Sequence, residues 1–124
     1  MGKAKEKGIT IDVHVTAADF SRFQITDLCS LLANGLENAI HGCEQLTDNE
    51  KRFIRLCIYE KNNRLCLEIH NSYAHEPTFE NKVPVSQKTR HGIGVKSMIH
   101  VAEKYEGVYR VSAKEGEFRF QMSM

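Results

Sequence analysis

The sequence predicts an α/β fold, a two-layer sandwich in which a mixed sheet is covered on one face by helices. Alternating apolar and polar residues indicate strands, and two stretches carry apolar residues at the spacing of an amphipathic helix. These segments follow one another as strand, helix, two strands, a long irregular segment, helix and two strands. The strands are expected at residues 9–15, 53–59, 65–69, 108–111 and 118–122.

The first predicted helix begins at Thr26, the expected N-cap, and ends at about residues 43–46. Asp27 in its first turn suits the helix dipole. At about 100° per residue, one apolar arc of this helix is expected to hold Leu28, Leu32, Leu36, Ala39 and Cys43.

The turns and the second helix follow from shorter signals. Residues 47–49 and 61–63 are rich in turn formers, and the second of these runs predicts a hairpin. A closing hairpin is expected around Lys114-Glu115-Gly116. The second helix is predicted to end near Gly107, and its apolar positions are Val95, Met98, Ile99, Ala102 and Tyr105.

Residues 72–91 show no periodicity and contain both prolines of the chain, Pro77 and Pro84. An irregular segment of this length inside a compact domain is uncommon and is usually functional, often as a lid over an active site. We therefore expect a lid between the third strand and the second helix.

Composition narrows the class of protein. The 124 residues fit one domain over 1–124, and 17 Lys and Arg against 16 Asp and Glu give no footprint for nucleic acid or an anionic membrane. No apolar run could span a membrane and no signal peptide opens the chain, so either the parent protein is cytoplasmic or this is a soluble domain of something larger. The charged first residues and the strand-like last ones favour a piece of a larger protein. No CxxC spacing occurs, and buried, reduced thiols are expected for Cys29, Cys43, Cys57 and Cys66.

Two asparagines one helical turn apart, Asn34 and Asn38, lie beside the apolar arc of the first helix. Asn is a mediocre helix former, so a helix that only packs would favour other residues there. Two carboxamide oxygens at this spacing can hold a hard cation such as Mg²⁺. Taken alone, the pair fits two solvated side chains better than a metal site.

A second candidate site is the glycine-containing segment His91-Gly92-Ile93-Gly94, which leads into the second helix. Glycines let a ligand approach the backbone closely, and a helix N-terminus attracts phosphate. Lys88, Arg90 and Lys96 add positive charge around it. A single GxG more often marks a tight turn, and neither a dinucleotide fingerprint nor a P-loop is present.

These two segments together resemble a known family. The Asn34/Asn38 helix resembles the N-box of the GHKL ATPase superfamily, which includes gyrase, heat-shock chaperones, histidine kinases and mismatch-repair ATPases. Residues 91–98 resemble its second glycine box, and residues 102–107 (AEKYEG) resemble the helix end that follows in histidine kinases. The closest similarity is to the ATP-binding domain of AgrC-type peptide-sensing quorum kinases, over about residues 9–122. The resemblance implies a Bergerat-type ATP-binding fold with a long ATP lid.

The resemblance also implies roles for residues, with ATP and Mg²⁺ as cofactors. Asn38 would be the main Mg²⁺ ligand, with Asn34 beside it at the metal or the γ-phosphate, and both would serve catalysis. His41 stands where many histidine kinases have a basic residue near the phosphates, although a solvated helix histidine is an equal reading. The second glycine box and the lid would supply the remaining phosphate contacts, from Lys88, Arg90, Gly92, Ile93, Gly94 and Val95.

At the position of the superfamily's first glycine box, this chain departs from the superfamily's pattern. Asn71 stands where an Asp would receive the adenine amino group, and Ser72 and Tyr73 follow in place of glycines. A neutral carboxamide oxygen is a weaker acceptor than a carboxylate, so weaker adenine binding is expected. AgrC-type kinases share this loss. A turn residue that closes the strand is the alternative reading of Asn71.

The resemblance implies the catalytic domain of a sensor histidine kinase, which presents Mg-ATP to a phosphoacceptor His. No segment here resembles the dimerisation helices that carry that His, so those helices and a response regulator are the implied partners. The parent protein would be membrane-anchored, without direct membrane contact by this part. Two alternatives remain: a degenerate GHKL domain acting as a binding or scaffolding module, and a stand-alone anti-sigma-type serine kinase.

Overall fold

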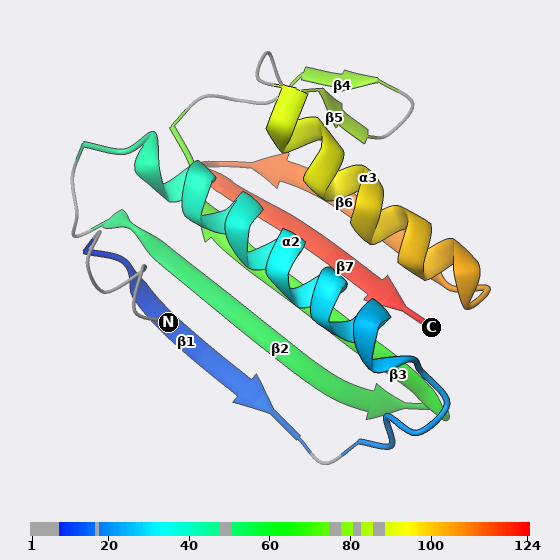
Figure 1. Cartoon of the computed structure of the whole chain (residues 1–124). Coiled ribbons are helices and arrows are strands. Elements are labelled where there is room, and N and C mark those ends of the chain that lie inside the picture. Colours follow the sequence, from blue (N-terminus) through cyan, green and yellow to red (C-terminus); the bar gives the residue numbers. More distant parts are fainter. Residues whose placement is uncertain (1–7, 17, 48–50, 75–77, 81–82, 86–88) are drawn as a thin grey trace.

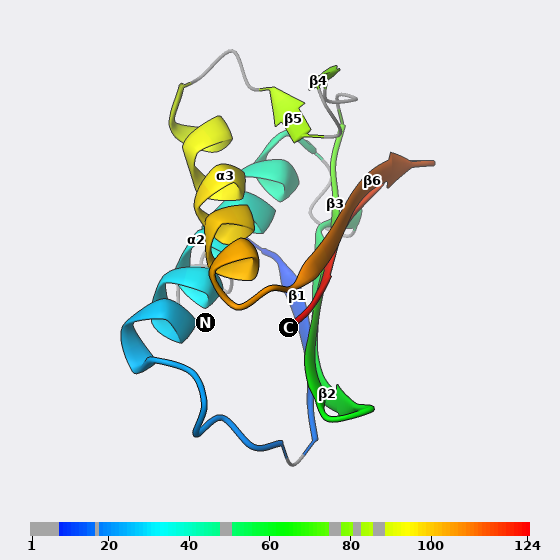
Figure 2. The same ribbon diagram turned by 90° about the vertical axis from the view of Figure 1, so that its right-hand side faces the viewer.

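The chain folds into two layers, a sheet and a pair of helices that cover one of its faces (Figures 1 and 2). The computed structural model describes residues 8–16, 18–47, 51–74, 78–80, 83–85 and 89–124, and gives side chains for those of them outside 75–93. None of the helices in this described part is long and apolar enough to cross a membrane. The predicted α/β sandwich is confirmed.

The main sheet has five strands in the order β1-β2-β3-β7-β6. Strand β1 pairs with β2 in parallel, and the other neighbours pair antiparallel, so the sheet is mixed as predicted. Most strands are longer than the sequence pattern indicated, because pairing extends them to the turns. The observed bounds are β1 Thr10–Val15, β2 Phe53–Lys61, β3 Arg64–Ser72, β6 Val108–Lys114 and β7 Glu117–Ser123.

Both predicted hairpins close with two-residue turns in which both residues have positive φ. Asn62 and Asn63 have φ of 54° and 61°, and Glu115 and Gly116 have φ of 52° and 78°. This is the type I′ geometry whose twist matches that of paired strands. Asparagine and glycine tolerate positive φ well, which explains why the sequence located these turns correctly.

The segment between β3 and the second helix contains secondary structure that the sequence did not predict. Strands β4 (Thr78–Glu80) and β5 (Val83–Val85) form a small antiparallel pair, drawn at the top of Figure 1. Three-residue strands are too short to show a period, and Pro84 argues against a strand unless it lies at an edge. The expectation of an irregular segment over residues 72–91 is therefore wrong at these two strands.

Helix α2 (Ile25–Glu44) has Gln24 as its N-cap, two residues before the predicted Thr26, and this N-cap makes no side-chain capping bond. Thr26 lies inside the first turn, so its predicted capping role is wrong. Contacts with the end of the second helix fix this start instead. The Tyr105 hydroxyl accepts from the Gln24 N–H at 3.0 Å and donates to Asp27, and Lys104 Nζ lies 2.9 Å from the same carboxylate. Hydrogen bonds from Lys104 and then Tyr105 lower the pKa of Asp27.

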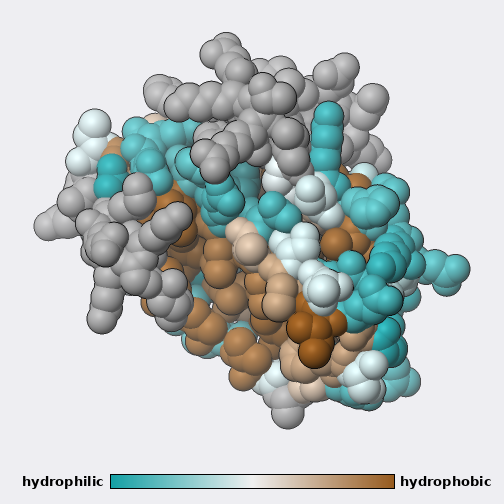
Figure 3. All heavy atoms as spheres, in the orientation of Figure 1, coloured by the Kyte–Doolittle hydropathy of each residue, from teal (hydrophilic) through white to brown (hydrophobic). Residues whose placement is uncertain are grey.

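The buried side of α2 differs from the predicted arc. Leu31, Gly35, Ala39 and Cys43 are buried, whereas the predicted Leu28, Leu32 and Leu36 are only partly buried. The reason is the position of helix α3 (Thr89–Lys104), which packs against α2 on one side. On the other side no helix of the described residues covers β1, and Val13 and Val15 there are 42% and 55% exposed. Hydrophobic residues, drawn in brown, gather along this side of α2 in Figure 3.

Helix α3 ends at Lys104, close to the predicted stop at Gly107. The Gly107 N–H donates to the Ala102 carbonyl at 2.7 Å, and the Glu106 N–H donates to the Glu103 carbonyl at 3.0 Å. This pair of bonds is the Schellman motif, and Glu106 takes the left-handed position in it with φ of 55°. Gly107 is needed for space, since a Cβ there would lie 2.6 Å from the Ser123 carbonyl oxygen.

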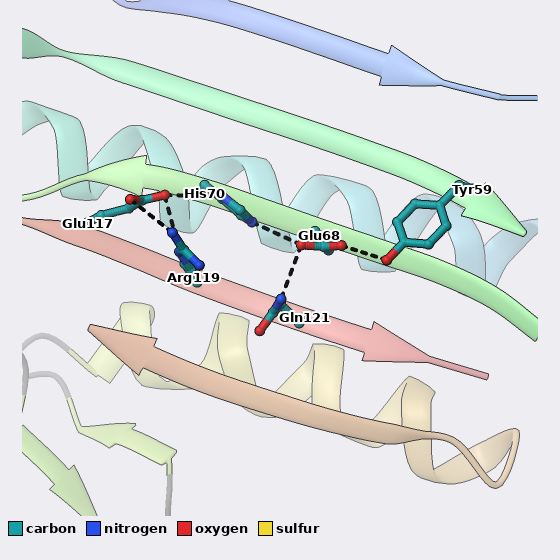
Figure 4. A network of polar contacts seen from close by, with 6 residues as sticks. All are labelled: Tyr59, Glu68, His70, Glu117, Arg119 and Gln121. Carbon is teal, nitrogen blue, oxygen red and sulfur yellow. Dashed lines mark hydrogen bonds and ion pairs between the residues drawn. The ribbon is translucent and has the colours of Figure 1, made fainter. Parts of the chain in front are cut away.

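The face of the sheet away from the helices carries a polar network (Figure 4). The Tyr59 hydroxyl donates to Glu68 at 2.6 Å, and this bond raises the pKa of Tyr59 to about 12 and lowers that of Glu68. His70 lies between two carboxylates, with 3.2 Å from Nε2 to Glu68 and 3.1 Å from Nδ1 to Glu117. The network crosses three strands and is completed by Arg119 and Gln121.

All four cysteines are free thiols, as predicted, but only Cys43 and Cys66 are buried. Cys57 is partly buried on the outer face of the sheet, and Cys29 is exposed on α2. The expectation that all four are buried is therefore wrong. The prediction rested on the apolar residues around each cysteine in the sequence, and these do not show whether the cysteine itself faces the core.

Candidate functional site

The segments singled out in the sequence meet along the C-terminal half of α2. A Cβ on Gly94 of α3 would lie 3.8 Å from the Asn34 backbone oxygen, and a Cβ on Gly42 would overlap the Asn71 side chain of β3. From Asn34 to Gly42 the helix rises by roughly 12 Å. Helix α3 and strand β3 thus approach α2 at opposite ends of this stretch, and Asn38 lies between the two places.

The Asn34 side chain is oriented by its own helix. Its Nδ2 donates to the Ser30 carbonyl oxygen at 2.8 Å and to Ser30 Oγ at 3.1 Å. The amide hydrogens of Asn34 are thereby used locally, and its Oδ1 is the atom left to accept a hydrogen bond or to ligate a cation. The side chain is partly buried at this position.

Asn38 is also partly buried, and its carboxamide makes no hydrogen bond to any residue that the structure describes. Nor do the described residues contain a cluster of three or more His, Cys, Asp or Glu able to hold a metal ion. Mg²⁺ suits such a sparse donor set, since it usually takes only one or two protein oxygens and completes its shell with water and substrate phosphate. The carboxamide oxygens of Asn34 and Asn38 fit this requirement.

His41 lies one turn after Glu37, and its Nε2 is 3.6 Å from the Glu37 carboxylate. Both side chains are on the outside of α2, with 30% and 54% exposed. This local pair agrees with the reading of His41 as a helix-surface histidine, and a contact with phosphate stays a prediction.

Asn71 lies on the helix-facing side of β3, opposite Ile54 of β2 and Phe118 of β7. Only 2% of it is exposed. Its Nδ2 donates to the Ser72 carbonyl at 2.9 Å, whereas its buried Oδ1 has no hydrogen-bond partner among the described residues. A buried acceptor without a partner is costly, commonly about 1–3 kcal/mol. Asn71 is a strand residue in the core, and the alternative of a turn residue closing the strand is wrong.

The backbone after Asn71 is held against α2 by a second set of contacts. The Ser72 hydroxyl accepts from the Phe53 N–H at 3.0 Å and lies 3.5 Å from Cys43 Sγ. Cys43 in turn donates to the Phe53 carbonyl at 3.2 Å, and burial raises the pKa of its thiol. These contacts tie β2, β3 and α2 together beside Asn71.

The second glycine box lies inside α3 and not before it. The helix begins at Thr89, so Arg90, Gly92, Ile93 and Gly94 occupy its first turns. The unpaired N–H groups of a helix are those of its first turn, which places them before Gly94. The expectation that the box precedes the helix is therefore wrong, although glycine disfavours a helical conformation.

The remaining predicted site residues differ in what the structure shows. The Val95 side chain is 1% exposed and belongs to the core, so only its backbone could contact a ligand. Lys88 lies outside the described residues, and the side chains of Arg90 and Ile93 are not described. Their phosphate contacts stay predictions.

Sequence reasoning missed Gly42, which contacts Asn71. One signal could have revealed it, because glycine inside a helix costs about 0.5–1 kcal/mol relative to alanine. A glycine one turn after Asn38 therefore indicates a close approach of another segment.

Comparison with known proteins defines the family. The model of the GHKL domain matches residues 23–124, and the chain belongs to this family. The resemblance found in the sequence is thereby confirmed at the level of the superfamily. Comparison with curated proteins finds no significant match.

Solved structures share the fold. The catalytic domain of the histidine kinase ThkA superposes with a TM-score of 0.74 at 17% identity, covering 99% of this chain and 84% of that one. Acinetobacter baumannii histidine kinase AdeS gives 0.69 at 10% identity, over 99% of this chain and 57% of that one. The histidine kinase domain of Erythrobacter litoralis EL346 gives 0.70 at 11% identity, over 94% and 51%. The fold is thus that of histidine kinase catalytic domains.

Proposed function

We propose that this chain is the ATP-binding catalytic domain of a sensor histidine kinase, which presents Mg-ATP for phosphoryl transfer to a histidine of separate dimerisation helices. The observation that carries the proposal is the meeting of three segments on α2: the Asn34/Asn38 pair, Gly94 of α3 and Asn71 of β3. Family membership and the shared fold of histidine kinase catalytic domains support it.

The proposed site has one end for phosphates and one for the base. At the phosphate end, Asn34 and Asn38 would offer carboxamide oxygens to Mg²⁺, and the start of α3 would attract phosphate oxygens through its dipole. Bound Mg²⁺ would neutralise charge on the phosphates. Phosphoryl transfer depends on such positioning and electrostatic stabilisation, so the protein itself needs no covalent intermediate.

At the base end, the buried Oδ1 of Asn71 would accept a hydrogen bond from the exocyclic amino group of adenine. This oxygen is buried, so a base reaches it only when a neighbouring side chain moves aside. The acceptor is neutral, and a hydrogen bond to a neutral group is roughly half as strong as one to a charged group. We therefore expect weak nucleotide binding.

The finer assignment is to the AgrC-type peptide-sensing kinases. Asn71 in the place of the superfamily's Asp, with Ser72 and Tyr73 in place of glycines, supports it. On this proposal the partners are the dimerisation helices of the parent protein and a response regulator, and the domain works on the cytoplasmic side.

Calorimetric titration with Mg-ADP and Mg-ATP at millimolar concentrations tests the proposal. Ligand at ten times Kd stabilises the fold by about 1.4 kcal/mol, which shifts the melting temperature by several degrees in a domain of this size. Asn63→Gly is a matched control, because it changes an asparagine in the β2–β3 turn whose φ of 61° suits glycine. The control is expected to bind as the unmodified protein does.

A second candidate function is a degenerate GHKL domain that acts as a binding module. The missing glycines after Asn71 favour it. The same titration separates the two, since such a module would show neither heat nor a thermal shift with Mg²⁺ and nucleotide. That result would refute the kinase proposal.

A further inference from the structure

Resting on the proposed function, we propose that Gly42 is a positioning residue that fixes the carboxamide of Asn71 and so lets the site prefer a base with an exocyclic amino group over one with an oxo group. Three features of the base end support this role: the space around Gly42, the bond made by Asn71 Nδ2, and the Asn71 Oδ1 without a partner among the described residues.

Gly42 leaves room for the Asn71 side chain. A Cβ at this position would overlap Asn71 Nδ2, and would lie 3.6 Å from Asn71 Cγ and 3.2 Å from the Ser72 carbonyl oxygen. The carboxamide therefore packs directly on the backbone of α2. Any larger residue at position 42 would push this amide group, and the Ser72 carbonyl with it, away from the helix.

The bond from Asn71 Nδ2 to the Ser72 carbonyl fixes the orientation of the carboxamide, that is, the positions of its nitrogen and its oxygen. A carboxamide can rotate by 180° and exchange its oxygen and nitrogen. In the rotated form two acceptor oxygens, Asn71 Oδ1 and the Ser72 carbonyl, would face each other at hydrogen-bond distance. The observed form, with Nδ2 on the carbonyl at 2.9 Å, is thus the favoured one.

The Ser72 carbonyl can play this part because its residue is itself held in place. Its hydroxyl accepts from the Phe53 N–H and contacts Cys43 Sγ, so β2 and α2 both restrain it. Gly42 and these contacts together hold one orientation of Asn71, in which Oδ1 is the available atom.

The consequence is selectivity between purine bases. An acceptor oxygen receives a hydrogen bond from the 6-amino group of adenine, whereas the 6-oxo group of hypoxanthine would place an oxygen against it. A site whose buried polar group is left unpaired by the wrong ligand discriminates against that ligand. Releasing the carboxamide to rotate would let Nδ2 serve the oxo group and reduce the preference.

The test compares Mg-ADP with Mg-IDP by calorimetry in the unmodified chain, Gly42→Ala, Asn71→Ala and the double variant. We expect the unmodified chain to prefer ADP and Gly42→Ala to reduce the ADP-to-IDP affinity ratio by about three- to tenfold, the value of one neutral hydrogen bond. In the Asn71→Ala background, Gly42→Ala is expected to leave the ratio unchanged. A purely structural role of Gly42 would weaken both nucleotides equally, and that outcome would overturn the inference.

Gly35→Ala is the matched control, because Gly35 is another glycine of α2 at which a Cβ would overlap a neighbour, here the side-chain ends of Ile69 and Met98. It is expected to change stability and to leave the ratio as it is. If Gly42→Ala does not fold, NMR of the unmodified chain decides: nuclear Overhauser contacts are expected between the Asn71 side-chain NH₂ and the Gly42 Hα protons, and their absence would refute the placement. Failure of the unmodified chain to bind either nucleotide would instead refute the proposed function.

Discussion

The Schellman turn after α3 offers a sharp test of the packing, the substitution Gly107→Ala. A Cβ at position 107 would lie 2.6 Å from the Ser123 carbonyl oxygen, 2.8 Å from Met124 Cβ and 3.0 Å from the Ala102 carbonyl oxygen. Two of these three atoms belong to the backbone and cannot rotate away. The φ of Gly107 is not positive, so the backbone conformation itself would accept alanine.

The cost follows from these contacts. Adding a methyl group to a closely packed site costs about 1–3 kcal/mol, and the upper part of this range applies where backbone must move. Loss of glycine's freedom in the unfolded chain returns about 0.4–1 kcal/mol. We expect a net destabilisation of about 2 kcal/mol. For a domain of this length the melting temperature would fall by roughly 6–10 °C.

Thermal unfolding followed by circular dichroism measures this effect. Glu106→Gly, in the same turn, is the control: it relieves the left-handed conformation at φ of 55° and is expected to raise the melting temperature slightly. A Gly107→Ala protein that melts within about 2 °C of the unmodified one would show that the C-terminal end of β7 does not press on this turn. That result would refute the close approach between Gly107 and the end of β7.

Three further outcomes are expected. Asn38→Ala should abolish the Mg²⁺ enhancement of nucleotide binding in calorimetry while stability changes by under about 0.5 kcal/mol; a large fall in the melting temperature of the ligand-free protein would identify a structural role instead. Absorbance at 295 nm should show one phenol ionising near pH 12 that Tyr59→Phe removes, and the stability that its bond to Glu68 contributes should be present below pH 10.0 and lost as the pH rises through about 12. The lowered pKa of Asp27 predicts a contribution to stability that is present above pH 3.8 and lost as the pH falls below it. Asp27→Asn should therefore lower the melting temperature at pH 7 and flatten the acid side of the plot of melting temperature against pH. An unchanged plot would contradict this expectation.

The order of the two helices and the five strands of the main sheet, and both of its hairpins, could be predicted because they depend on local signals. Asn62 and Gly116 tolerate the positive φ that a two-residue hairpin turn demands, so a short run of sequence carries the information. The alternation of β2 and the helical spacing of α3 are equally local. The mixed sheet then followed from the order alone.

Tertiary contacts decided what the sequence pattern misjudged. Leu31 is buried and Leu32 only partly so, because α3 covers one side of α2 and leaves the β1 side open. The N-cap moved to Gln24 because Tyr105, far along the chain, accepts its N–H. Neither the position of α3 nor the contact with Tyr105 can be predicted from helical spacing or from capping preferences.

In the candidate site, too, local signals could be read from the sequence and tertiary contacts could not. The asparagine pair and the glycine box stand out locally, but only the resemblance to the GHKL family suggested that they lie together. Gly42 was missed because its role depends on Asn71, a residue 29 positions away whose side chain it meets. The start of α3 at Thr89 was misjudged because glycines were taken to end a loop, whereas the helix here runs through Gly92 and Gly94.

Strands β3 and β7 are neighbours in the sheet and bring Ser72 opposite Glu117, and the chain between these two residues runs from Tyr73 to Gly116. The entropy of closing such a loop grows only with the logarithm of its length, by about 0.6 kcal/mol for each doubling. Residues could therefore be inserted or deleted between β5 and α3 at small thermodynamic cost, while β3 keeps Asn71 in place and α2 keeps Asn34 and Asn38. The length of this connection can thus change without moving the strand and the helix that carry the three asparagines.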